Sequence, residues 1–238
     1  MIINHYQTCG ECEFTPLCLP QIDQKMSHFN QCLPIQRQLV LKKGEILFTP
    51  HTPFQCLYAV KLGAIKTVQT ESNGEELIRN FYFTGEIFGY KAIHQGEYRS
   101  TAKALCESHV CEINYREFLH FIQQNPHLQE HVMYSACSHI NRGSYLHTKS
   151  AERKVAAFLL DLSNRLHPFP IKGVLYLPIP RQDIASYLRL TPETLSRIST
   201  KFIRNKIIAV DKRKLTLLKP ELLQGIADGR VESKIEFR

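Results

Sequence analysis

The chain has 238 residues, of which 43% are hydrophobic, and it carries a formal net charge of +8. This length and hydrophobic content suffice for one large or two smaller packed cores. No apolar run approaches the length needed to cross a bilayer, and no basic region followed by an apolar stretch begins the chain. We therefore expect a cytoplasmic protein with no membrane segment, whose 8 cysteines are ligands, redox groups or buried side chains rather than disulfides.

The excess positive charge lies towards the C-terminus. Residues 1–150 contain 13 basic and 13 acidic side chains, whereas residues 151–238 contain 17 basic and 9 acidic ones. A neutral first part with a basic second part is typical of a sensor domain joined to a phosphate-binding domain. A solvated basic face explains the charge equally well, so the motifs must decide.

Three cysteines, Cys9, Cys12 and Cys18, stand close together near the N-terminus. The segment around them contains Pro16 and Pro20 and has no apolar period, so it offers no core in which thiols could be buried. Thiols at this density outside a disulfide framework usually hold a metal. The triplet therefore indicates a metal-binding segment.

Short apolar runs separated by glycines extend from residue 35 to about residue 113. The Asn73-Gly74 dipeptide within this region is a strong hairpin signal. Regularly spaced short strands of this kind predict a β-sandwich or jelly roll. The clearest runs are 45–48, 56–60, 64–68 and 77–83.

Helical patterns follow, the first from Tyr115 and the second after Pro126, a residue suited to the first helical turn. Apolar residues recur every four positions along the second helix and form one stripe. The stripe consists of Leu128, Val132, Ala136 and Ile140. It can pack on the β-domain of its own chain or form the seam of a dimer. We favour the dimer seam, because coiled-coil interfaces use this spacing.

Residues 180–218 carry the main functional signal. A short helix at 183–188 is followed by a tight link and by a second helix with three agreeing start signals. Thr191 can cap that helix, Pro192 suits its first turn, and Glu193 complements its positive end. Two such helices predict a helix-turn-helix, whose second helix enters the major groove of DNA. Apolar runs around a basic tip at 211–214 predict a hairpin wing that contacts phosphates.

The polar side chains of the second helix fit base recognition. Arg197 can donate two hydrogen bonds to guanine, Glu193 can accept one from cytosine, and Ser196 can bind a base or a phosphate. Thr194 and Lys201 lie outside the apolar face and complete the expected DNA-binding set. An exposed ion pair between Glu193 and Arg197 is the alternative interpretation, but the wing and the basic charge favour DNA binding.

The order of these parts resembles that of the CRP/FNR family of bacterial transcription regulators over nearly the whole chain. The resemblance implies an α+β fold with an N-terminal cyclic-nucleotide-binding-like β-barrel (a jelly roll), a long dimerisation helix and a C-terminal winged helix-turn-helix. The implied boundaries are 1–30 for a cysteine-rich segment, 31–124 for the barrel, 125–150 for the helix and 151–238 for the DNA-binding domain.

The segment 190–197 looks like the recognition helix of the FNR branch, in which Glu, Ser and Arg contact a TTGAT-type half-site. Those roles carry over to Glu193, Ser196 and Arg197, while Pro192 replaces an apolar residue of the family. The resemblance implies a regulator, not an enzyme, that binds double-stranded DNA as a homodimer. It also implies contact with RNA polymerase, through the loop at 71–76.

The cysteines also resemble those of the FNR branch, in which a Cys-x2-Cys-x5-Cys triplet and one cysteine of the barrel hold an oxygen-sensing [4Fe-4S] cluster. Cys9, Cys12 and Cys18 match the triplet, and Cys111 matches the fourth ligand through the Val-Cys-Glu-Ile sequence at 110–113. Cys106 is the alternative fourth ligand.

Other interpretations remain open. Four thiolates also suit zinc, and the three N-terminal cysteines could form a thiol–disulfide redox switch without a cluster. An RNA-binding or interaction protein is disfavoured, because the chain has no aromatic-studded sheet motif. Cyclic-nucleotide binding is disfavoured because Gly89-Tyr90-Lys91 stands where the nucleotide-binding members of the family supply a carboxylate.

Overall fold

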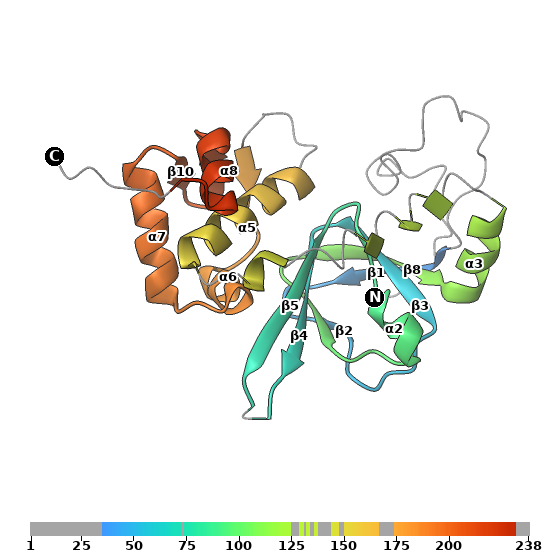
Figure 1. Cartoon of the computed structure of the whole chain (residues 1–238). Helices are drawn as coiled ribbons and strands as arrows, with labels where there is room; N and C mark the ends of the chain where they lie inside the picture. The colour runs from blue at the N-terminus through green and yellow to red at the C-terminus, as the bar shows by residue number, and fades with distance from the viewer. Residues whose placement is uncertain are drawn as a thin grey trace. The chain divides into compact units, whose positions relative to one another are not determined.

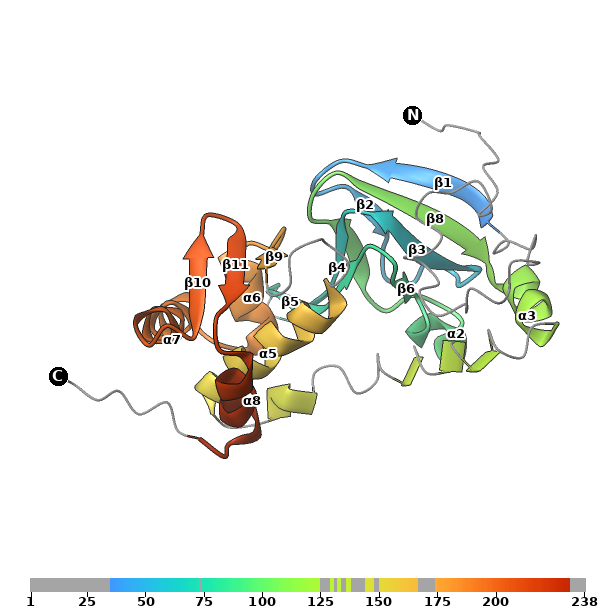
Figure 2. The ribbon, with the colours of Figure 1, turned by 90° about the horizontal axis from the view of Figure 1, so that it is seen from above.

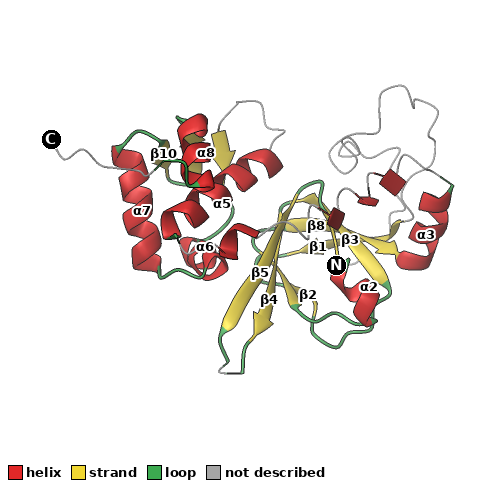
Figure 3. Cartoon of the chain, viewed as in Figure 1, coloured by secondary structure: helices red, strands yellow, loops and turns green. Residues whose placement is uncertain are grey.

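The computed structural model describes residues 35–72, 74–124, 129–130, 132–133, 136–137, 144–147, 150–166 and 174–231. The chain divides into two compact units, Met1–Ile140 and Asn141–Arg238. In the described residues the first unit consists mainly of strands and the second mainly of helices (Figure 3). The predicted α+β class is therefore confirmed.

The N-terminal unit is a jelly roll of two antiparallel sheets (Figure 1). One sheet has the strand order β1-β8-β3-β6 and the other the order β2-β7-β4-β5. The strands are β1 (Ile35–Leu41), β2 (Ile46–Phe48), β3 (Cys56–Leu62), β4 (Ala64–Thr70), β5 (Glu76–Phe83), β6 (Ile87–Phe88), β7 (Thr101–Ala104) and β8 (Ser108–Asn114). All four runs singled out in the sequence coincide with strands.

Side chains between the two sheets form the inner core, which is rich in aromatic rings. The rings of Phe48 and Tyr98 stack with centroids 3.9 Å apart, and those of Tyr82 and Phe88 with centroids 4.7 Å apart. Full burial of a large apolar side chain contributes about 1.5–3 kcal/mol. This core therefore supplies much of the driving force that holds the two sheets together.

The first sheet has a second apolar face on its outer side. Side chains alternate along β8, so Val110 belongs to the inner core whereas Cys111 belongs to the outer face. Helix α3 (Tyr115–Gln123) covers this face, beyond the end of β8 (Figure 2). The buried residues there, called the outer cluster below, are Leu57, Ala59, Ile87, Cys111, Ile113, Phe118 and Ile122.

Two residues of the predicted apolar stripe of the central helix, Leu128 and Ile140, lie outside the described residues. Val132 is half-buried and packs against the outer cluster. Ala136 is helical and half-buried as well. Among the described residues of the stripe, Val132 thus contacts the barrel of its own chain, and the dimer seam stays a prediction.

The hairpin predicted at Asn73-Gly74 is present, because β4 and β5 pair along their length. Its loop closes through a hydrogen bond from the Glu71 amide to the Glu75 carbonyl, 2.9 Å long. Figure 1 shows the hairpin extending away from the rest of the barrel.

The turn between β3 and β4 approaches the start of β8 closely. Gly63 has a φ of +97°, and a Cβ there would lie 2.5 Å from the Ser108 Oγ. The Ser108 hydroxyl accepts a hydrogen bond from the Ala64 amide (3.1 Å) and donates one to the Cys106 carbonyl (2.9 Å). The strand that carries Cys111 therefore begins from a fixed turn.

The C-terminal unit surrounds helix α5 (Ala151–Arg165), whose apolar side faces α7 and α8. A three-stranded sheet of order β10-β11-β9 completes it. The other elements are η3 (Ser144–His147), β9 (Val174–Tyr176), α6 (Arg181–Leu188), α7 (Pro192–Arg204), β10 (Ile208–Asp211), β11 (Lys214–Leu217) and α8 (Pro220–Asp228); α2 (Lys91–Gln95) belongs to the barrel. No helix within the described residues is long and apolar enough to span a bilayer.

Candidate DNA-binding surface and cysteine site

Helices α6 and α7 form the predicted helix-turn-helix. Arg189 ends α6 in the left-handed conformation (φ 54°), and the Leu190 amide donates to the Ala185 carbonyl, so the chain turns within a few residues. Helix α7 then begins as predicted: the Thr191 hydroxyl accepts from the Thr194 amide at 3.2 Å, and Pro192 occupies the first turn.

Helix α7 is strongly amphipathic. Leu195, Ile198 and Phe202 are buried and fix its orientation in the unit. Glu193, Ser196 and Arg197 are exposed on the opposite side, as the sequence predicted. These are the side chains expected to contact bases, and burial restrains none of them.

A groove lies between this exposed side of α7 and the start of α5. It is lined by Ser150, Ala151, Glu152, Pro192, Glu193, Ser196, Arg197, Ile198, Thr200, Lys201 and Arg204. The three residues expected to contact bases thus share one concave surface with three other charged side chains. These are Lys201 and Arg204 of α7 and Glu152 of α5.

Two residues of the expected DNA-binding set are engaged within the protein. Thr194 is half-buried, and its hydroxyl oxygen lies 3.1 Å from that of Thr191. The Lys201 ammonium donates to a carboxylate oxygen of Glu152 at 2.6 Å. Sequence reasoning missed this ion pair, because the two residues are 49 positions apart.

The wing is the β10–β11 hairpin, which lies beside α7 (Figure 2). Its tip consists of Asp211, Lys212, Arg213 and Lys214, and the first three are exposed. Lys212 takes a left-handed φ of 53°, which closes the hairpin tightly. An exposed basic tip of this kind suits contact with phosphates rather than with base edges.

Of the four expected cluster ligands, Cys9, Cys12 and Cys18 lie outside the described residues. Cys111 is buried, with 4% of its surface exposed, and belongs to the outer cluster. It stands opposite Gln38 of β1. Because β1 follows the N-terminal segment directly, Cys111 lies on the strand next to the one that this segment enters.

Cys106 occupies a different place. It lies half-buried in the turn before β8, with its Sγ 3.9 Å from the Ser108 Oγ. In the register of β1 and β8, Leu41 at the end of β1 pairs with Ser108, whereas Ile35 at its start pairs with Ile113. Cys106 is therefore at the far end of β8 from the point where the N-terminal segment joins the sheet.

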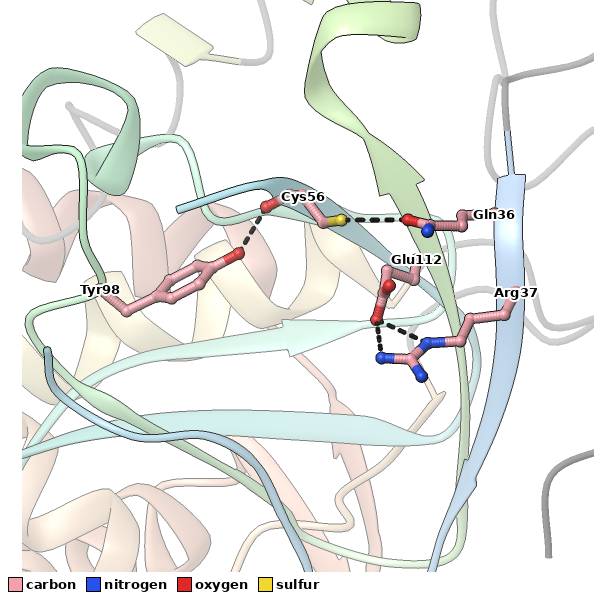
Figure 4. Close-up of polar contacts among 5 residues, drawn as sticks. All are labelled: Gln36, Arg37, Cys56, Tyr98 and Glu112. Atoms are coloured by element: carbon pink, nitrogen blue, oxygen red, sulfur yellow. Dashed lines mark hydrogen bonds and ion pairs between the residues drawn. The ribbon is translucent and has the colours of Figure 1, made fainter. Parts of the chain in front are cut away.

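A polar network inside the barrel ties β1 to β8 and β3 (Figure 4). The Arg37 guanidinium donates to one oxygen of Glu112 from Nε (3.1 Å) and from Nη2 (3.0 Å). The Cys56 thiol donates to the Gln36 side chain at 3.6 Å, and the Tyr98 hydroxyl donates to the Cys56 carbonyl. Burial, followed by the charge of Glu112, raises the pKa of the Cys56 thiol to about 11, so this thiol is not a reactive group at neutral pH.

The barrel also contains the pocket that corresponds to the nucleotide-binding alternative. Arg79, Lys91 and Arg99 are among its lining residues, and none of the described lining residues carries a carboxylate. The inner-core rings of Phe48, Tyr82, Phe88 and Tyr98 also line it. The carboxylate expected of a ribose site is therefore missing from the described pocket. Among the described residues, moreover, no group of three or more metal-binding side chains gathers at one point.

The fold and the exposed face of α7 define a DNA-binding regulator with an N-terminal jelly-roll domain. Residues 38–125 match the model of the cyclic nucleotide-binding domain, and residues 153–226 match that of the Crp-like helix-turn-helix domain. The chain is 32% identical to the transcriptional activator protein Anr of Pseudomonas protegens, over 94% of each chain. It is 31% identical to the fumarate and nitrate reduction regulatory protein of Escherichia coli, over 92% of this chain and 90% of that one.

The chain therefore belongs to the CRP/FNR family of transcription regulators, in its FNR branch. Solved structures agree with the fold. FixK2 from Bradyrhizobium japonicum superposes with a TM-score of 0.69 at 24% identity, covering 79% of this chain and 95% of that one. A CooA mutant from Carboxydothermus hydrogenoformans gives a TM-score of 0.64 at 20% identity, covering 80% and 87%.

Proposed function

We propose that this regulator is oxygen-responsive, that it holds a [4Fe-4S] cluster through Cys9, Cys12, Cys18 and Cys111, and that the cluster promotes dimerisation and binding to TTGAT-like palindromic sites. The single observation that carries the proposal is the outward placement of Cys111 on β8, next to the strand that the cysteine-rich segment enters. The bound cluster would supply a centre that oxygen dismantles.

The residues present fit such a cluster. Four thiolates are its usual ligand set, and the chain offers a triplet together with a fourth thiol in the barrel. Between Cys18 and Ile35 the chain can extend about 3.3–3.6 Å per residue, which is ample to return to Cys111. Cys111 is two positions from Ile113, the partner of Ile35, whereas Cys106 lies beyond the opposite end of β8. This placement favours Cys111 over Cys106.

The outer cluster offers a route from the ligand to the dimer helix. Cys111 is a member of this cluster, and Val132 packs against it. Val132 is one of four residues proposed for the dimer seam, together with Leu128, Ala136 and Ile140. A change in the position of Cys111 would therefore alter the packing of the helix at 125–150, and so bias the monomer–dimer equilibrium.

The DNA contacts are proposed to come from α7. Arg197 would donate to guanine, Glu193 would accept from cytosine, and Ser196 would bind a base or a phosphate, because all three are exposed on one side of the helix. Thr194 would act through the cap that orients the first turn. In a dimer, two copies of α7 would lie about one DNA turn apart, roughly 34 Å, as palindromic half-sites require.

Further contact with RNA polymerase is proposed for the loop between β4 and β5. Glu71, Glu75 and Glu76 are exposed there, at the end of a hairpin that extends from the barrel (Figure 1). This contact would account for activation of transcription.

The cluster is tested by spectroscopy under nitrogen. The anaerobic protein should show a broad absorbance near 400 nm and stoichiometric iron and sulfide, both of which air should remove. Cys111→Ala should lose them and Cys106→Ala, as the matched control, should keep them. The opposite pattern would assign the fourth ligand to Cys106. A colourless protein with bound zinc would refute the cluster, as would a metal-free protein that air converts to a disulfide.

The DNA contact is tested separately with Arg197→Ala. We expect this variant to lose discrimination worth about 1–3 kcal/mol at one base pair of each half-site, while keeping most of its salt-dependent, non-specific binding. Arg230→Ala, which removes the same charge outside the groove, serves as control. Equal loss of affinity for all sequences would contradict the assigned role of Arg197.

A further inference from the structure

The groove of the DNA-binding unit contains an ion pair that base recognition does not require. Glu152 of α5 and Lys201 of α7 meet at 2.6 Å, and their side chains are 31% and 23% exposed. Both line the same groove as Ser196 and Arg197. The pair therefore lies beside the surface that would face the DNA.

Lys201 has the chemistry and the position of a phosphate contact. It lies on α7 about one turn after Arg197, and its ammonium reaches into the groove. A lysine held within 3 Å of a carboxylate is already neutralised, so it attracts a phosphate much less than an unpaired lysine does. The carboxylate also repels a phosphate that approaches the same groove.

Glu152 is held in place for this role. It lies in the first turn of α5, two residues after the cap residue Ser150, where the positive end of the helix stabilises a carboxylate. Helix α5 is itself anchored, because Val155, Phe158 and Leu162 are buried. The competing charge is thus fixed to the core of the unit and does not lie on a loop.

We propose that Glu152 is an intramolecular competitor of the DNA phosphates for Lys201, and that it sets the affinity and salt dependence of DNA binding. The proposal rests on the proposed placement of DNA along α7. In the wild type, Lys201 stays with Glu152 and adds no ionic contact. Without the carboxylate, Lys201 gains one phosphate contact per protomer.

The size of the effect follows from counterion release. Each neutralised phosphate changes the slope of log Kobs against log salt concentration by about 0.9, hence by ~1.8 for a dimer. Between 50 mM and 200 mM salt, the affinity of a Glu152→Gln dimer should therefore fall about 12-fold more than that of the wild type. Because contacts to phosphates carry no sequence information, the change in slope should be equal on specific and random DNA.

The experiment measures binding of the full chain, kept under nitrogen, to a palindromic TTGAT-type duplex and to a scrambled duplex between 50 mM and 200 mM salt. Glu152→Gln is compared with Glu221→Gln, which removes the same charge from the first turn of α8, outside the groove. Lys201→Ala and the double variant Glu152→Gln with Lys201→Ala complete a double-mutant cycle.

We expect a steeper slope for Glu152→Gln alone, and wild-type slopes for Glu221→Gln, Lys201→Ala and the double variant. A slope reduced by ~1.8 in Lys201→Ala would show that the lysine already contacts phosphate in the wild type, which would overturn the proposal. So would equal slopes for Glu152→Gln and Glu221→Gln. If the wild type does not distinguish the two duplexes, the proposed function fails instead.

Discussion

Replacement of Arg37 by Met should destabilise the barrel through the carboxylate that it leaves behind. Glu112 is buried (5% exposed) and receives two hydrogen bonds from Arg37. Removing one partner of a fully buried ion pair costs about 3–5 kcal/mol. The Arg37 side chain is 48% exposed, so water can reach part of the site. We therefore expect the lower figure of ~2–3 kcal/mol.

The measurement is urea unfolding of the full chain, followed by far-ultraviolet circular dichroism because the chain contains no tryptophan. Arg99→Met is the control, since Arg99 pairs with Glu97 on the surface and should contribute less than ~1 kcal/mol. The double variant Arg37→Met with Glu112→Leu should be more stable than Arg37→Met, because it leaves no buried charge. A loss no larger than that of the control would refute the reasoning, as would a double variant that is no more stable than Arg37→Met.

Three further outcomes are expected. Gly63→Ala should cost at least ~3 kcal/mol in urea unfolding, because it combines a left-handed φ with a clash; Gly44→Ala has the same sign of φ but open space, and should cost about 1–2 kcal/mol. At pH 8, iodoacetamide should modify the exposed Cys137 long before Cys56, whose raised pKa of about 11 leaves about one thiolate per thousand molecules; equal labelling of both thiols would contradict this difference in reactivity. The stability that the raised pKa of Cys56 contributes is complete below pH 9 and falls as the pH rises from 9 to about 11. Thr191→Ala removes the cap of α7, so it should lower stability by ~1 kcal/mol and weaken DNA binding; an unchanged melting temperature would exclude a role for the cap.

Local patterns predicted most of the fold. The strands of the barrel follow from short apolar runs between glycines, and the observed β3, β4 and β5 extend those runs by one or two residues at their ends. The start of α7 could be predicted because Thr191, Pro192 and Glu193 each act within one helical turn. Strand β9 was missed because it has only three residues and is defined by its pairing with β11. Helix α8 was also missed, although Pro220 begins it and Leu223 and Ile226 form its buried side.

The ion pairs between residues far apart in the sequence could not be predicted from it. The partner of Lys201 is 49 positions away, and the partner of Arg37 is 75 positions away. No local pattern connects such residues, because the contact exists only once the elements have packed. For this reason Lys201 was predicted as a DNA contact from its place on the helix, and the carboxylate that competes for it was not seen.

The alternation of side chains along β8 has a consequence for how this strand tolerates change. Cys111 and Glu112 are consecutive, yet the thiol faces the outer cluster and the carboxylate pairs with Arg37 inside the barrel. A slip of the strand by a single residue would exchange these two environments, burying the thiol in the interior and pressing a charge against α3. Insertions or deletions within β8 should therefore abolish the ligand and the fold together, whereas length changes in the loop before β5 should leave both intact.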